Sequence, residues 1–209
     1  MTTVYTFNNK VLKNSATDKW LTKKAEVDPY NPLNLPPYTI RLLYNDGATP
    51  TVIMGTGVQV SQSPNIWDWT YNNTVWESLL EEEYDLLEVL GANTSGVTNM
   101  AGMFTHCDSL TTAPLFDTSS VTNMSNMFRQ CGSLTTAPLF DTSSVTNMSQ
   151  MFDDCTNVET GALALYQQAS TQATPPSNHD RTFRHCGSGT VTGTAELAQI
   201  PSDWGGTGD

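Results

Sequence analysis

The sequence predicts an α+β fold in which a solenoid of about five rungs, each 24 residues long, follows a small β-rich N-terminal domain. The main observation is a twelve-residue string, Leu-Thr-Thr-Ala-Pro-Leu-Phe-Asp-Thr-Ser-Ser-Val, which runs from Leu110 to Val121 and recurs unchanged from Leu134 to Val145. A repeat this short cannot bury its own apolar face, so its copies must stack. The second observation is a set of strand-like runs before the repeat. We therefore expect an N-terminal domain over residues 1–72 and the solenoid, with a C-terminal cap, over 73–209.

Apolar residues recur at fixed positions of the repeat, which indicates buried columns that run through the stack. The acid-rich segment from Trp76 is expected to form a capping first rung, and the segment around Phe183 a degenerate last one. The columns consist of Val97, Val121 and Val145; Met100, Met124 and Met148; Met103, Met127 and Met151; Phe104, Phe128 and Phe152; Cys107, Cys131 and Cys155; Leu110, Leu134 and Val158; Pro114 and Pro138; Leu115 and Leu139; and Phe116 and Phe140.

An insertion interrupts the repeat over residues 161–180. It begins with good helix formers from Ala162 to Ala169, which predict a helix. Prolines and small polar residues follow up to Asn178 and predict an exposed loop. The insertion either caps the open end of the stack or serves as a contact loop, and we favour the cap.

The N-terminal part is expected to be rich in β structure. Strand-like runs at Tyr38–Tyr44 and Thr51–Met54 flank a turn-rich segment, so they predict a hairpin. Before the hairpin, four prolines predict an extended connector, because proline fixes φ and lacks an amide donor. These prolines are Pro29, Pro32, Pro36 and Pro37.

Charge is distributed unevenly along the chain, whose net charge is -12. Residues 1–24 carry five lysines and one acid, a net charge of +4, and the remainder carries four arginines and twenty acids, a net charge of -16. The acidic repeat argues against a nucleic-acid partner, because phosphate binding needs a basic face. The basic arm could dock on an acidic neighbour such as another copy of this chain, although a solvated charge run is commoner. Its lysines are Lys10, Lys13, Lys19, Lys23 and Lys24.

Aromatic residues gather between the two expected domains. Trp67, Trp69 and Tyr71 lie close together in the sequence, and Trp76 follows. Such residues are favoured in protein contacts and can stack on sugar rings. They also form packed junctions between small domains, which is the interpretation we favour.

The cysteines and histidines of the repeat do not predict a metal site. Three cysteines are spaced by the repeat period rather than as Cys-x2-Cys pairs, so buried free thiols are favoured over zinc ligands, while the spacing does not exclude disulfides. His106 and His185 share a column with Gln130 and Asp154, which predicts a solvent-facing position.

No arrangement of residues predicts catalysis. No serine, histidine and acid can be brought together by their spacing. The acid cluster lacks the central glycine of a calcium loop and is expected to be a solvated face. We therefore predict no enzymatic activity, no catalytic residue, no metal site and no cofactor. The cluster consists of Glu77, Glu81, Glu82, Glu83, Asp85 and Glu88.

Hydroxyl and amide side chains form ladders along the repeat and give a candidate binding surface. They either satisfy the backbone of turns or offer a polar, uncharged contact face. The residues are Thr118, Ser120, Thr122, Asn123, Thr142, Ser144, Thr146 and Asn147.

The repeat resembles a known family. The order Cys-x2-Leu, then Pro-Leu, then Val-Thr-Asn-Met-Ser-x-Met-Phe-x2-Cys, over about 76–188, is similar to the BspA-like family of treponemal-type leucine-rich repeats, found in bacterial surface proteins and phage or prophage proteins. The resemblance implies a right-handed leucine-rich-repeat solenoid with one short strand per rung, within Leu134–Phe140 and its equivalents. It also implies a helical or turn segment around Met124–Gln130, and binding or adhesion without catalytic residues.

The function expected from these features is that of a non-enzymatic binding or structural module. Residues 1–14 lack the apolar stretch of a secretion signal, and no run is long enough to span a membrane. We therefore expect a phage virion protein such as a fibre, decoration or host-attachment protein, with a bacterial cell-surface adhesin as the alternative. Its partners would be other virion or surface proteins at the N-terminal region and a host-surface glycan or protein at the repeat, in a chain that could form a homo-oligomer.

Overall fold

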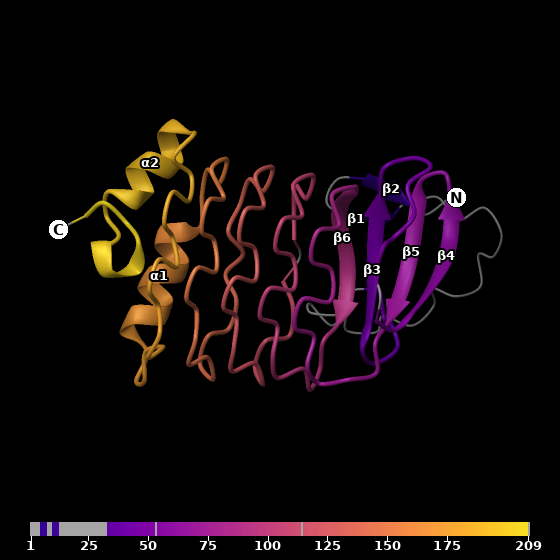
Figure 1. Ribbon diagram of the computed structural model, residues 1–209, viewed down its shortest axis with the longest axis horizontal. Helices are drawn as coiled ribbons and strands as arrows, with labels where there is room; N and C mark the ends of the chain where they lie inside the picture. Colours follow the sequence, from indigo (N-terminus) through magenta and orange to yellow (C-terminus); the bar gives the residue numbers. More distant parts are fainter. Residues whose placement is uncertain (1–4, 8–9, 13–32, 53, 114, 209) are drawn as a thin grey trace.

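The chain forms an elongated molecule with a sheet at one end and two helices at the other (Figure 1). Between them, successive turns of the chain lie side by side. Most of the predicted basic arm lies outside the described residues, as do Pro29, Pro32 and Pro114. The computed structural model describes residues 5–7, 10–12, 33–52, 54–113 and 115–208, the first two ranges as backbone alone.

Two antiparallel sheets contain the regular strands of the described chain. The larger has the strand order β4-β5-β3-β6, and the smaller pairs β1 with β2. Strand β6 lies beyond residue 72 but pairs with β3, so the two expected domains share this sheet. The strands are β1 (Tyr5–Phe7), β2 (Lys10–Leu12), β3 (Thr39–Tyr44), β4 (Thr56–Gln62), β5 (Asn65–Thr70) and β6 (Leu86–Asn93).

The predicted hairpin is wrong in its second strand. Strand β3 forms as expected, but its partners are β5 and β6 rather than the segment 51–54. Residues 51, 52 and 54 lie outside any strand. Polar groups from elsewhere bind this segment instead: Glu83 accepts a hydrogen bond from the Thr51 amide at 2.8 Å, and the Trp69 indole donates to the Met54 carbonyl at 2.6 Å.

One face of the sheet is buried because apolar residues alternate along its strands. Ile40, Leu42 and Tyr44 of β3 are all buried. Trp69 of β5 lies over Gly57 of β4, where an added Cβ would be only 2.0 Å from the indole ring. Gly57 is therefore required by the close approach of Trp69.

Backbone hydrogen bonds one period apart join the turns of the repeat. The amide of Met100 donates to Asn123 at 2.9 Å, and the amide of Met124 donates to Asn147 at 2.8 Å. Asn99, Asn123 and Asn147 are linked in series by isolated parallel bridges. We call residues 97–120 the second layer, 121–144 the third layer, and 73–188 the repeat stack.

The predicted leucine-rich-repeat solenoid of about five strand-bearing rungs is wrong. The regular structure is instead the four-stranded antiparallel sheet and two short helices. The strand expected within Leu134–Phe140 is a single bridge at Thr136, and 124–130 forms turns rather than a helix. Left-handed backbone at Asn126 (φ 57°) and Gln130 (φ 61°) explains the missing helix, because such residues occur singly and interrupt helical geometry.

Buried side-chain columns form the core of the repeat stack. The ring of Phe128 stacks on Phe104 at 5.2 Å and on Phe152 at 5.3 Å, and the methionines of the columns are fully buried. All four cysteines are free and buried, which confirms the favoured interpretation. The Cys131 thiol donates to the Phe104 carbonyl at 3.0 Å, so these thiols also link neighbouring turns.

The acid cluster is only partly the solvated face that we expected. Glu83 and Glu88 are buried, with 4% and 7% of their surface exposed. Glu83 accepts a hydrogen bond of 2.9 Å from the Tyr44 hydroxyl. Burial, together with the adjacent Glu83 carboxylate, raises the pKa of Tyr44 far above its usual value. This carboxylate therefore joins the sheet to the start of the repeat stack.

The predicted helix in the insertion is confirmed as α1 (Ala162–Thr171), and α2 (Val191–Leu197) follows it. Helix α1 covers the third layer: Gln168 donates to the Phe140 carbonyl at 2.5 Å, and Gln172 donates to the Thr142 carbonyl at 3.0 Å. These contacts agree with the capping interpretation. A short 3-10 helix, η1 (Ser202–Trp204), is the last helical element of the described chain. No helix in the described ranges is long and apolar enough to cross a bilayer.

Candidate functional site

The predicted surface of threonine, serine and asparagine is largely used to join turns of the chain. The Thr122 hydroxyl donates to the Thr98 carbonyl at 3.2 Å, and the Thr146 hydroxyl donates to the Thr122 carbonyl at 3.1 Å. Thr118 and Thr142 are buried and therefore cannot meet a ligand directly. The Ser144 hydroxyl donates to the Ser119 carbonyl. The side-chain oxygens of Asn123 and Asn147 each accept a hydrogen bond from the backbone amide two residues later. Ser120 is exposed.

A polar column of the repeat has a left-handed backbone, which the sequence did not lead us to predict. Gln130 and Asp154 have φ of 61°, and His106 and His185 in the same column have φ of 60° and 56°. The two histidines and the aspartate at this repeat position could have indicated this conformation, because His and Asp are enriched among left-handed residues. His185 contacts Asp154 at 2.7 Å. Among the described residues, no group of three or more His, Cys, Asp and Glu side chains is arranged to hold a metal ion.

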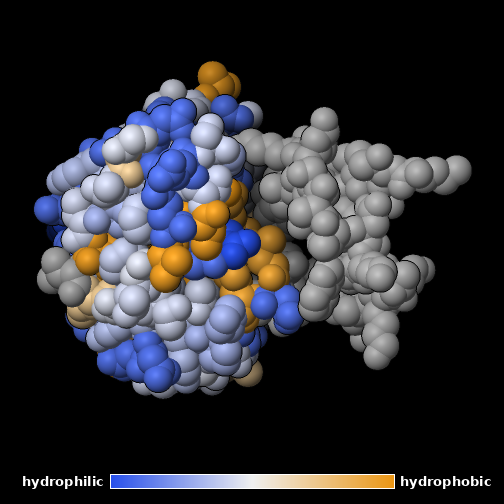
Figure 2. Space-filling view, turned by 90° about the vertical axis from the view of Figure 1, so that its right-hand side faces the viewer, coloured by the Kyte–Doolittle hydropathy of each residue, from blue (hydrophilic) through white to orange (hydrophobic). Residues whose placement is uncertain are grey.

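The aromatic cluster lies on and after β5. Trp69 is buried, whereas Trp67 and Tyr71 are partly exposed. Figure 2 views the β4 end of the molecule, where hydrophobic residues gather near the middle of the surface. The large exposed hydrophobic side chains of β4 are Val58 and Val60. Trp69 joins the same buried core as the columns of the repeat stack, as a junction would.

An apolar groove crosses the two copies of the duplicated string. Its volume is about 700 Å³. Leu115 and Leu139, predicted to be a core column, are instead 42% and 49% exposed at this groove. Each leucine precedes a buried phenylalanine, and adjacent residues of an extended segment point to opposite sides. The lining consists of Glu88, Thr111, Thr112, Ala113, Leu115, Thr136, Ala137, Pro138 and Leu139.

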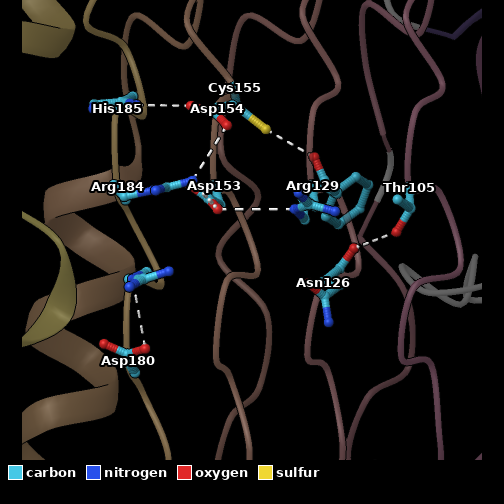
Figure 3. A network of polar contacts seen from close by, with 11 residues as sticks. Thr105, Asn126, Arg129, Asp153, Asp154, Cys155, Asp180, Arg184 and His185 are labelled. Carbon is cyan, nitrogen blue, oxygen red and sulfur yellow. Dashed lines mark hydrogen bonds and ion pairs between the residues drawn. The ribbon is translucent and has the colours of Figure 1, made fainter.

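Charged side chains form a ladder on the repeat stack (Figure 3). The Asp153 carboxylate is 1% exposed and accepts hydrogen bonds of 2.6 and 2.8 Å from Arg184. These bonds raise the pKa of Arg184. Arg129 approaches Asp153 from the neighbouring layer at 3.8 Å, which is an ion pair but not a hydrogen bond.

A family match falls on the repeat stack. Residues 76–176 match the family model described as "Mycoplasma protein of unknown function, DUF285". DUF285 is related to BspA-like repeat surface proteins, so the resemblance in the sequence is confirmed in part, without its leucine-rich-repeat geometry. The segment that matches DUF285 includes the whole lining of the apolar groove. No curated protein and no solved structure matches the chain.

Proposed function

We propose that this chain is a non-enzymatic binding module whose apolar groove takes an extended segment of a partner protein. The observation that carries the proposal is the exposure of Leu115 and Leu139 side by side in one groove. Burial of a leucine that is already half covered contributes about 1 kcal/mol, roughly half of the value for a full side chain. Exposed apolar patches with polar surroundings are typical of interaction sites.

The charge of the molecule favours a basic partner. Between Leu33 and Gly208 the chain carries four arginines and seventeen acids, a net charge of -13. Opposite charges speed association and suppress wrong partners. We therefore expect the bound segment to combine apolar side chains for the groove with lysine or arginine beside them.

The match to DUF285 supports a setting on a bacterial surface, because that family is related to BspA-like surface proteins. That the chain is part of a phage particle remains our other prediction. Proteomics distinguishes the two settings. Detection of this chain on intact cells after surface labelling would support the adhesin, and its enrichment in purified virions would support the virion protein.

Selection from a random peptide library tests the groove. The full chain is immobilised, and peptides that also bind the double variant Leu115→Ser/Leu139→Ser are removed. We expect the remaining peptides to share alternating apolar residues and at least one basic residue. Val191→Ser is the matched control, because Val191 is 89% exposed outside the groove. Peptides that all bind the double variant as well as the natural chain would contradict the proposal.

A further inference from the structure

A second cavity, which we call the polar notch, lies over the second layer of the repeat stack. Its volume is about 280 Å³, and its lining is almost entirely polar. It shares no lining residue with the apolar groove. The lining consists of Glu77, Ser78, Glu81, Ala101, Gly102, Thr105, Asn123, Ser125, Asn126 and Arg129.

The polar notch exists because Thr105 is smaller than the residues one period away on both sides, and Gly102 is smaller than the residue one period later. Gly102 lies one period before Asn126, and Thr105 lies one period after Glu81 and one before Arg129. Backbone hydrogen bonds one period apart keep these segments in register. Larger side chains on both sides therefore form two walls over a floor of Gly102 and Thr105.

One wall holds Arg129, whose side chain makes no hydrogen bond in the described structure. Arg184 already donates to both carboxylate oxygens of Asp153, which leaves Arg129 at 3.8 Å. The Nε of Arg129 is buried and has no hydrogen-bond partner among the described residues. The Arg129 side chain is 35% exposed and lines the polar notch, so it can contact a ligand there.

The opposite wall holds carboxylates. The Glu77 carboxylate accepts one long hydrogen bond, of 3.3 Å, from the side-chain amide of Asn99. Glu81 is exposed, and its carboxylate receives no hydrogen bond within the described chain. The floor includes Thr105, which is buried with 5% of its surface exposed and whose hydroxyl donates to the Asn126 carbonyl at 2.8 Å.

We propose that the polar notch binds one sugar unit of a glycan. An anionic ligand would face Glu77 and Glu81, and a cationic ligand would face Arg129, so the two walls favour a neutral ligand that both donates and accepts. Sugar hydroxyls do both: they donate to carboxylates and accept from a guanidinium. The volume of the polar notch lies just below the range of drug-sized small-molecule sites, about 300 to 1,000 Å³, which suits a single ring.

Titration of the full chain with neutral monosaccharides tests this site. Glucose, galactose, mannose and N-acetylglucosamine are added separately while NMR records the Nε–Hε signals of the arginines. At least one sugar is expected to shift the Arg129 signal in a saturable way, with the Arg181 signal unchanged. The Arg129→Lys variant assigns the signal, because it removes one Nε–Hε cross-peak. Glycine is added as a zwitterionic probe.

Two variants test the shape and the charge of the polar notch. Gly102→Asn places on the floor the residue found one period later, at a φ of 63° that asparagine tolerates, and should weaken sugar binding at least tenfold. Glu81→Gln keeps the shape of the wall and should weaken binding severalfold. Arg181→Gln is the control, since this arginine lies outside the polar notch and is 53% exposed.

The proposal is overturned if no sugar shifts the Arg129 signal, or if glycine shifts it and the sugars do not. Binding that survives both Gly102→Asn and Glu81→Gln would also overturn it. Should Gly102→Asn fail to fold, Glu81→Gln decides alone, because the Glu81 side chain is exposed and its carboxylate accepts no hydrogen bond in the described structure. Loss of peptide binding at the apolar groove leaves this result untouched.

Discussion

The sheet and the repeat stack satisfy their backbones in different ways. Strands β3 and β5 pair residue by residue from Thr39 to Tyr44, whereas neighbouring turns of the repeat meet at isolated bridges such as Asn123 with Asn147. The repeat adds hydrogen bonds from threonine hydroxyls and cysteine thiols to carbonyls of neighbouring turns. The second and third layers therefore stay ordered through side-chain columns and isolated bridges, without regular strands.

The difference also affects where surfaces arise. In the sheet, Gly57 leaves space for the ring of Trp69, so this variation in side-chain size is used for packing within the sheet. In the repeat stack, a position that changes from one layer to the next alters the outer surface while the buried columns stay the same. The polar notch at Gly102 and the apolar groove at Leu115 are both consequences of this freedom.

Alkaline pH is expected to have the largest effect, and to act on the repeat stack. Burial raises the pKa of all four of its thiols. Their contribution to stability is fully present below about pH 8.5, the usual pKa of a thiol, and is lost as the pH rises, because the unfolded chain releases these protons first. Each thiol lowers the free energy of unfolding by about 1.4 kcal/mol per pH unit in that range.

Urea unfolding between about pH 7 and pH 10 measures this loss. The sequence has no cysteine before the repeat stack. If the two regions unfold separately, the free energy of unfolding reported by a probe in the repeat stack should therefore fall more steeply with pH than that reported by a probe in the N-terminal part. Cys131→Ala should reduce the slope with pH. An unfolding free energy that stays constant to pH 10 would show that the thiols are not buried.

Truncation of the phenylalanine column comes next. Phe128 is fully buried between Phe104 and Phe152, so Phe128→Ala should lower the free energy of unfolding by about 3–5 kcal/mol. Gln130→Ala, at a partly exposed position of the same layer, should cost little. Thermal or urea unfolding measures both, and equal small losses would mean that the inside and outside of the layer are reversed.

Substitution of one glycine in each region compares how closely the sheet and the repeat stack are packed at these positions. Gly57→Ala should destabilise the sheet by about 1–3 kcal/mol, because its Cβ would overlap the Trp69 ring. Gly132→Ala in the repeat should be nearly neutral, since an added Cβ meets nothing within 4 Å. Chemical unfolding compares the two variants. Similar losses for both would contradict the close approach at Gly57.

The smallest expected effect concerns the left-handed column of the repeat. Gln130→Gly should raise the free energy of unfolding by up to about 1 kcal/mol, because glycine adopts a φ of 61° without strain. The same change at Leu42 in β3, which has an extended backbone and a buried side chain, should be strongly destabilising. Loss of stability in Gln130→Gly would show that this column is not left-handed in solution.

The sequence predicts the buried columns well, because identical spacing of Met, Phe and Cys can arise only if the copies stack. It fails at Leu115 and Leu139, since identity between copies does not say which side of an extended segment a residue faces. The strand partners of β3 depend on β5 and β6, which are distant in the sequence, so local turn signals suggested the wrong hairpin. The polar notch becomes visible only when Thr105 is compared with Glu81 and Arg129, one period away on either side, and Gly102 with Asn126.

Calorimetric titration of a library-selected peptide tests the central claim most directly, namely that the repeat stack presents a binding groove at Leu115 and Leu139. We expect the double variant Leu115→Ser/Leu139→Ser to bind at least tenfold more weakly, a loss of about 1.4 kcal/mol or more, while Val191→Ser binds like the natural chain. Equal affinity of the folded double variant and the natural chain would contradict the claim.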